Sequence, residues 1–176
     1  MAALAALSVA GPLAHPPTAV AAACARADAI PSQASRSQIT RASVCMINAE
    51  RRVHGLSALQ VNSRLSTAAR RHSLDMVRRR YFSHTEPTGV DFVQRIRAAG
   101  YLTSVNRWLV GETLGWGWGA GASAHRIVRA WMHSPAHRRI LLTPSYREVG
   151  VGVVWGGPRR RAAPDATFTA NFGVTN

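Results

Sequence analysis

The sequence predicts an α+β domain in which helices pack against a mainly antiparallel sheet. The segments with helical periodicity lie between about residues 37 and 142, and two segments of alternating apolar residues follow near the end of the chain. Helices first and strands late is the order typical of α+β domains. A length of 176 residues and a hydrophobic fraction of 47% fit a single domain with a real core.

Five helical segments are expected. The first covers about residues 37–54, carries Ala42, Met46 and Ala49 on one face, and is followed by Gly55, a good stop residue. Asn62 or Ser63 is expected to cap the second. The second helix is expected to cover about residues 63–79. The three later helices are expected at about 91–99, with Gly100 as the C-cap, 122–132 and 135–142.

The last of these segments begins with Ser134 and Pro135, which form a strong helix-start signal. A serine side chain accepts a hydrogen bond from a free amide of the first turn, and proline at the first helical position loses no hydrogen bond. This placement puts His137 in the first turn of the helix. His72 lies on the apolar face of the second helix, where we expect a hydrogen-bonded core histidine rather than a ligand.

Three segments have strand character. Residues 107–116 form the first and lead into a glycine-rich loop, whereas 147–156 and 166–174 alternate well and are joined as a hairpin. The segment "LSALQVN" is expected to be a connector between the first two helices.

The N-terminal region predicts export. Residues 1–23 have the small apolar composition of a secretory signal, although a positive n-region is missing and the true start is expected to lie upstream. Residues 24–36 are expected to be an arm, and residues 37–176 the folded domain. Lipid attachment at Cys24 is an alternative to simple cleavage.

Cys24 and Cys45 are the only two cysteines. In an exported chain two cysteines with none left over most simply pair, and the bridge would stabilise by about 3 kcal/mol. The alternative is two free thiols, one of them removed with the signal.

The chain is strongly basic, with a formal charge of +14 from 22 arginines against 8 acidic residues. Such a surface favours anionic cell-wall polymers or anionic lipid as partners. Nucleic acid is not favoured, because no helix interleaves arginine and aromatic residues as a binding module does.

Three residues at element ends lack an obvious structural role: His84, Glu112 and His137. Two imidazoles and a carboxylate suit a divalent metal such as zinc, with an open position for water, or a general acid–base pair. The alternative is a buried polar network, and spacing alone does not decide between them. A serine hydrolase is not favoured, because the sequence has no Gly-x-Ser-x-Gly elbow.

Several segments together resemble a known family. "RLSTAARRHSLDMVRRRYFSHTEPTG", "VGETLGWG" and "IVRAWMHSPAHRRILLTPSYREVGVGVV" are similar to the bacterial SCP-domain branch of the CAP superfamily, which contains cysteine-rich secretory, antigen 5 and pathogenesis-related proteins. The resemblance covers about residues 43–176. The placement of the cysteines resembles secreted actinobacterial members.

The resemblance implies an α-β-α sandwich with a cleft holding two histidines and two acids, able in some members to bind a divalent metal. His84, Glu112 and His137 match three of these four positions. The second acid would fall near Ser134, where this chain has none, so Glu86 and Asp91 are the nearest spare acids. We therefore expect a secreted, non-enzymatic binding or envelope-interaction module, with a metal-dependent, peptidase-like hydrolase as the alternative.

Overall fold

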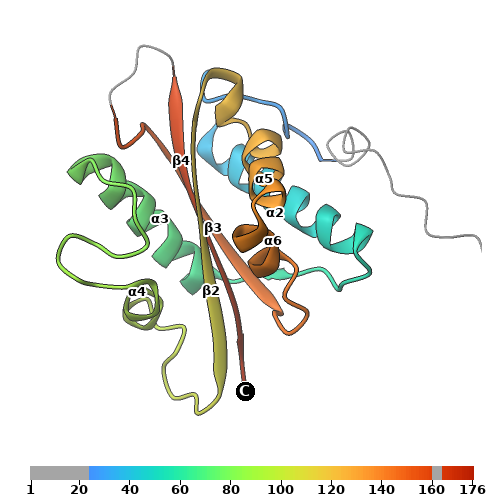
Figure 1. Cartoon of the computed structure of the whole chain (residues 1–176), viewed down its shortest axis with the longest axis vertical. Helices are drawn as coiled ribbons and strands as arrows, with labels where there is room; N and C mark the ends of the chain where they lie inside the picture. The colour runs from blue at the N-terminus through green and yellow to red at the C-terminus, as the bar shows by residue number, and fades with distance from the viewer. Residues whose placement is uncertain (1–23, 160–163) are drawn as a thin grey trace, which may run out of the picture.

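A four-stranded sheet forms the middle layer of the protein (Figure 1). The computed structural model describes residues 24–159 and 164–176, so the predicted signal at 1–23 lies outside the described residues. The sheet has the order β1-β3-β4-β2. Strand β4 pairs antiparallel with both β3 and β2, whereas β1 pairs parallel with β3. The strands are β1 (Gln60–Val61), β2 (Trp108–Trp118), β3 (Glu148–Trp155) and β4 (Asp165–Thr175).

Helices cover both faces of this sheet, as Figure 1 shows. Helix α3 packs on β3 and β4 and is joined on its face by α4, whereas α2, α5 and α6 lie on the opposite face. The described residues thus form the predicted α+β sandwich with a mainly antiparallel sheet. The helices are α2 (Arg36–Val53), α3 (Ser63–Arg79), α4 (Phe92–Ala98), α5 (Ala124–His133) and α6 (Pro135–Leu141), with a 3₁₀ turn, η1 (Gly119–Ala122), before α5.

The main core lies between the sheet and the α2–α5 layer. Phe168 and Phe172 of β4 point into it and are fully buried, and Trp131 of α5 is 2% exposed. The indole of Trp131 is polar at one atom, and its Nε1 donates to the carbonyl of Leu114 at 2.7 Å. This bond satisfies the indole N–H inside the core and ties α5 to the edge strand β2.

Helix α3 approaches the other face of the sheet unusually closely. A Cβ placed on Gly152 would lie 2.1 Å from the backbone nitrogen of Arg70, and one on Gly150 would lie 2.1 Å from that of Ser66. Glycine is therefore required at both positions. The contact is polar as well, because Ser73 donates to the Gly152 carbonyl and meets the Thr169 hydroxyl at 2.8 Å.

The predicted helix starts all lie within two residues of the observed ones, and side chains cap several of them. Asn62 caps α3, Asp91 caps α4, and Ser123 caps α5 through its side chain. Pro135 occupies the start of α6 as predicted. Ser134 is the N-cap residue by position, but its side chain makes no capping hydrogen bond, so its predicted role as a hydrogen-bonding cap is wrong. In its place, the proline ring at the first helical position supplies the preorganisation.

The strands differ from prediction in two places. β2 continues to Trp118, two residues past the predicted end, because its pairing with β4 extends to Asp165. β1 was expected to be only a connector, yet Gln60 and Val61 pair with Glu148 and Val149. Two residues are too short a segment for a detectable alternation, so this pairing has no local signature.

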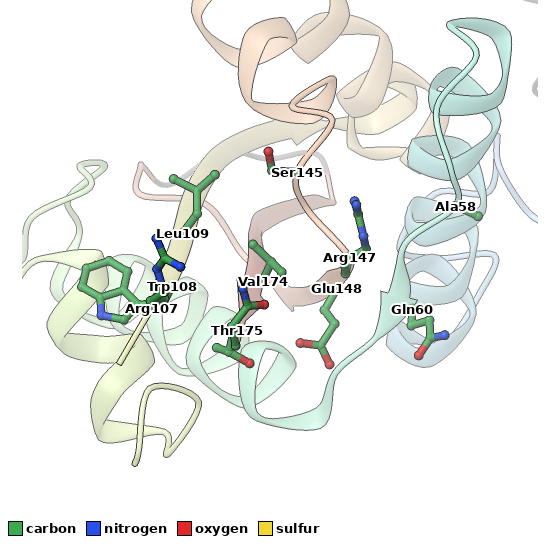
Figure 2. A pocket seen from close by; sticks show the side chains of 11 residues that line it. Ala58, Gln60, Arg107, Trp108, Leu109, Ser145, Arg147, Glu148, Val174 and Thr175 are labelled. Carbon is green, nitrogen blue, oxygen red and sulfur yellow. The ribbon is translucent and has the colours of Figure 1, made fainter. Parts of the chain in front are cut away.

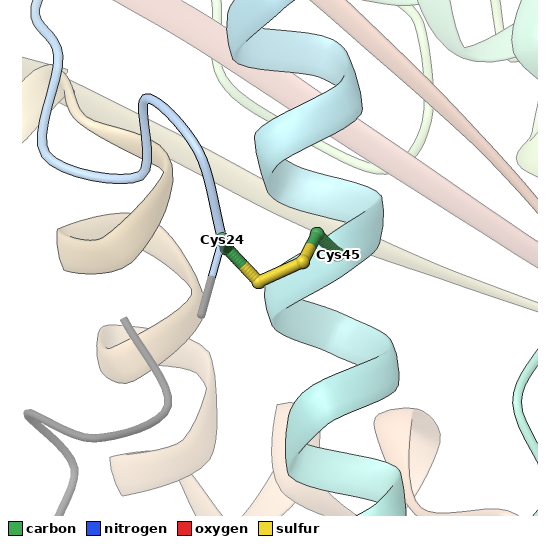
Figure 3. Close-up of a disulfide and its surroundings, with 2 residues drawn as sticks. All are labelled: Cys24 and Cys45. Carbon is green, nitrogen blue, oxygen red and sulfur yellow. A yellow bond between two sulfur atoms is a disulfide. The ribbon is translucent and has the colours of Figure 1, made fainter. Parts of the chain in front are cut away.

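The predicted disulfide is present. Cys24 and Cys45 are bonded, with their Cα atoms 5.7 Å apart, and the bond ties the arm to the middle of α2 (Figure 3). The arm also packs: Ala27 is buried, its carbonyl accepts from the His125 amide, and Asp28 contacts the His125 ring at 2.7 Å. In the described part of the chain, no helix is both long and apolar enough to cross a bilayer.

Candidate functional site

Glu112 is the centre of a buried polar cluster. It lies in β2 opposite Asn171 of β4, and it is only 2% exposed. A carboxylate in such a position needs hydrogen-bond donors and a compensating charge. Arg95 supplies both, because its Nη2 lies 3.0 Å from each of the two Glu112 oxygens.

Arg95 is brought to this position by α4. Asp91 caps the helix and forms a reciprocal capping box with Gln94, which fixes the start of this short helix. Arg95 then points inward and is 8% exposed. Its guanidinium also donates to the carbonyls of Val90 and His84, so the same side chain fixes the loop that carries His84.

His84 contacts the cluster from the loop that follows α3. Its Nδ1 donates to Glu112 Oε1 at 2.9 Å, while its side chain is 48% exposed. The buried carboxylate therefore fixes one ring nitrogen and orients the ring. The other nitrogen, Nε2, is left available on the exposed part of the imidazole.

His137 approaches from the opposite layer. It lies in the first turn of α6, which contacts β2. Burial first, and the charge of His84 second, lower the pKa of His137 below its ordinary value of 6.5. The two imidazoles are thus near enough to interact electrostatically across the edge strand β2, although α3 and α6 lie on different faces of the sheet.

The structure brings two of the three predicted site residues into contact, and the three do not form one ligand set. His84 and Glu112 are in direct contact, and His137 interacts with His84 through its charge. Within residues 24–159 and 164–176, no group of three His, Cys, Asp or Glu side chains is arranged to hold a metal ion.

Residues 44–172 match the cysteine-rich secretory protein (CAP) family. The chain belongs to this family. Its curated relatives include the uncharacterized protein YkwD of Bacillus subtilis, which is 34% identical over 112 residues, 64% of this chain and 41% of the relative. The uncharacterized membrane protein YlbC of the same organism is 31% identical over 61% of this chain and 29% of the relative. The chain spans less than half the length of either one.

Solved structures show the same fold. An outer surface protein of Borrelia burgdorferi superposes with a TM-score of 0.66 at 23% identity, covering 81% of this chain and 97% of that protein. An extracellular SCP-domain protein of Bacillus anthracis gives a TM-score of 0.59 at 22% identity, over 79% of this chain and 43% of that one. These bacterial relatives place the CAP domain in the predicted bacterial branch, and an actinobacterial source stays a prediction.

The Glu112 carboxylate of this CAP domain does not fit a metal ligand. A carboxylate offers about four lone-pair positions. Arg95 takes one on each oxygen, and His84 takes the second on Oε1. The Asn171 amide, oriented to satisfy both of its groups, donates to Oε2 at 3.1 Å and takes the fourth. The Arg95 cation also repels a second cation. Zinc binding at His84, Glu112 and His137 stays a prediction that this geometry does not favour.

Neither spare acid replaces the missing fourth residue of the cleft. Asp91 accepts from the Gln94 amide as the cap of α4. Glu86 lies 3.7 Å from an Arg79 nitrogen and 3.9 Å from an Arg95 nitrogen. Both carboxylates are thus engaged in holding the loop and helix near His84, and neither is an unpaired general base.

His72 behaves as the predicted core histidine. It is fully buried, and its Nε2 lies 3.0 Å from the Ser83 carbonyl, so the neutral ring donates there. Burial is the main cause that lowers the pKa of His72, opposed by the nearby carboxylate of Glu112. The bond fixes the chain one residue before His84 and thereby supports the exposed ring.

Arg95 and Asn171 are the site residues that the sequence did not reveal. From the sequence, Arg95 is expected to be a solvated charge, because arginines are mostly exposed and its neighbour Ile96 is the residue expected to face the core. The segment "TFTANF" does place Asn171 at a regular two-residue spacing from Thr167 and Thr169, and all three are buried. A buried asparagine in this series was the available signal for an internal polar partner.

A separate cavity of about 790 Å³ lies at the start of β2 (Figure 2). Trp108 and Leu109 are exposed beside it, while Arg147 and Glu148 line its other part. Two of the charged residues that line it, besides Arg107, have partners: Arg147 donates to two backbone carbonyls, and Glu148 accepts from the Tyr101 hydroxyl. None of the three predicted site residues lines this cavity.

Proposed function

We propose that this CAP domain is a secreted binding module of the cell envelope and not an enzyme. The observation that carries the proposal is the complete use of the Glu112 oxygens by Arg95, His84 and Asn171. A carboxylate neutralised in this way is a structural anchor. It presents the exposed His84 ring as a fixed contact beside His137, where a ligand can bind.

The location outside the cell has independent support. A disulfide such as Cys24–Cys45 persists in oxidising compartments and is rare in the cytosol. Proteins of the same fold are described as an outer surface protein and as an extracellular protein. Residues 1–23 have the composition of a secretory signal.

The charge of the chain indicates the class of partner. An excess of 14 positive charges attracts anionic cell-wall polymers or anionic lipid. Because most arginines are exposed, this attraction is screened by salt.

Co-sedimentation with isolated cell envelopes tests the proposal. The mature chain should sediment with envelopes that retain their acidic polymers and lipids, and the bound fraction should fall steeply between about 0.05 and 0.5 M salt. Envelopes extracted to remove the acidic components are the matched control and should retain much less protein. Equal retention by extracted envelopes would contradict the proposal.

A metal-dependent hydrolase is the second candidate, and one observation favours it. The contact of 2.9 Å between His84 and a buried carboxylate is the arrangement that orients an imidazole for acid–base work. In this candidate, His84 and His137 would hold zinc, and the metal would activate water.

Zinc titration separates the two candidates. Specific binding should release protons and raise the thermal stability of the parent, but not that of a His84→Ala/His137→Ala variant. A His54→Ala/His133→Ala variant removes two exposed histidines and is the matched control. We expect no difference between the parent and the two variants; zinc stabilisation lost only in the His84/His137 variant would favour the hydrolase.

A further inference from the structure

Three arginines line a groove on the β1–β3 side of the sheet, away from the edge strand β2. The groove has a volume of about 620 Å³. One wall is the start of α2, with Arg36 and Arg41, and the other is the first half of α3, with Arg70. Residues 151–153 of β3 form its floor.

These arginines differ from those of the His84 site because no acid balances them. Arg36, Arg41 and Arg70 make no hydrogen bond or ion pair among the side-chain contacts of the described residues. All eight acidic residues of the chain lie in the described ranges, and none lines the groove. Three guanidinium groups facing one groove repel one another, and a bound anion would relieve that repulsion.

The rest of the polar lining consists of hydroxyl groups, of which Ser66 donates to the Asn62 carbonyl and Ser35 and Ser37 contact each other. It includes five hydroxyl side chains, from Ser35, Ser37, Thr40, Ser66 and Thr67. The amide of Gln38 in the first turn of α2 is already capped by Ser35. The donor character of the groove therefore comes from arginines and hydroxyls of two helices, not from the helix terminus.

The floor adds backbone amides. Strand β1 pairs only with Glu148 and Val149, and the Val149 carbonyl accepts from the Asn62 amide on that side. Because the backbone direction repeats every two residues along a strand, Val151 and Val153 turn their N–H and C=O groups toward the same edge, beyond the end of β1.

We propose that this groove binds a phosphate ester group of an anionic envelope polymer or lipid headgroup. Arginines pair with phosphate through two parallel hydrogen bonds, and hydroxyl and amide groups donate to its remaining oxygens. A phosphate group presents acceptors in several directions and so uses donors from both helices and the floor at once. The inference rests on the proposed envelope-binding function and assigns that function a site separate from the His84 cleft.

Calorimetric titration with inorganic tripolyphosphate tests the groove without any envelope material. The triple variant Arg36→Gln/Arg41→Gln/Arg70→Gln should lose at least about tenfold in affinity, since it removes three charged hydrogen-bonding groups. The matched variant Arg97→Gln/Arg126→Gln/Arg129→Gln removes the same charge from exposed positions elsewhere and should change affinity by less than about threefold. Equal losses in the two variants would overturn the proposal.

Two further measurements keep the test decisive. In NMR spectra of the parent, tripolyphosphate should shift the amide resonances of Val151 and Val153. This measurement does not depend on whether the groove variant folds. If these amides do not shift while others do, the assignment of the site to the groove is overturned. A glutamate oligomer of equal charge should bind at least about tenfold more weakly. Equal affinity for this oligomer would assign the groove to acidic peptides and overturn the phosphate proposal.

Two binding experiments identify the source of the phosphate: one uses phosphatidylglycerol vesicles and the other uses poly(glycerol phosphate). Binding in either arm that the groove variant loses supports the proposal and names the source, and binding in neither arm overturns it. Failure of the envelope function is distinguishable. If envelopes retain the parent and the groove variant equally, the groove proposal fails and the envelope function stands. If the parent binds tripolyphosphate in the groove but binds no envelope material, the proposed envelope function fails.

Discussion

Replacing Arg95 with methionine tests the central contact of the candidate site. Arg95 and Glu112 are 8% and 2% exposed, so the substitution leaves a buried carboxylate without its charge partner. Removing one partner of a buried ion pair costs about 3–5 kcal/mol. Because Glu112 keeps its bonds from His84 and Asn171, we expect the lower end, about 3 kcal/mol.

Urea unfolding followed by tryptophan fluorescence measures this loss of unfolding free energy. An unchanged slope of that free energy against urea concentration shows that the same transition is being compared. Arg97→Met, on the exposed side of the same helix, is the control and should change stability by less than about 0.5 kcal/mol. The double variant Arg95→Met/Glu112→Gln carries no buried charge and should be more stable than the sum of the single losses predicts. If Arg95→Met costs no more than Arg97→Met, the Glu112 carboxylate does not depend on Arg95, and the argument against metal binding fails.

Three other perturbations test the fold. Cys24→Ser should lower the free energy of unfolding by about 3 kcal/mol, because the bridge joins positions 21 residues apart, and reductant should destabilise the parent equally; a loss below about 1 kcal/mol would refute this. Gly152→Ala should cost about 1–3 kcal/mol by pushing α3 off the sheet, whereas Gly121→Ala, with open space around it, should be nearly neutral; thermal unfolding that shows equal effects would contradict the close packing. Burial lowers the pKa of His72 in the folded state, so the unfolded chain takes up a proton first as pH falls below about 6.5, and stability should decline there and level off below the folded-state pKa. His72→Gln should flatten this decline in denaturation measured between about pH 7.5 and pH 5, and an unchanged slope would show that other groups cause it.

The zinc and envelope experiments ask different questions of the molecule. The first concerns whether the exposed His84 ring and His137 can act together although Glu112 is engaged by Arg95. The second concerns the exposed arginines, which make no hydrogen bond or ion pair with Glu112. A result in one therefore leaves the other proposal standing.

The sequence by itself determined the parts of this protein that depend on local interactions. Helix starts at Asn62 and Asp91 follow from side chains that bond amides two or three residues away, and the stripe of α3 follows from the helical period. The strands β3 and β4 follow from alternation over eight or more residues. The disulfide followed from an even cysteine count in a chain expected to be exported.

Only the tertiary structure decided how the candidate site is built. Whether Glu112 is a free ligand or a neutralised anchor depends on Arg95, 17 positions away, and Asn171, which is reached only through the pairing of β2 with β4. The charge of His84 lowers the pKa of His137 although the two residues are 53 positions apart, and no spacing along the chain records that interaction. Burial and pairing set the chemistry of charged groups, and both are properties of the packed chain that no short window of sequence contains.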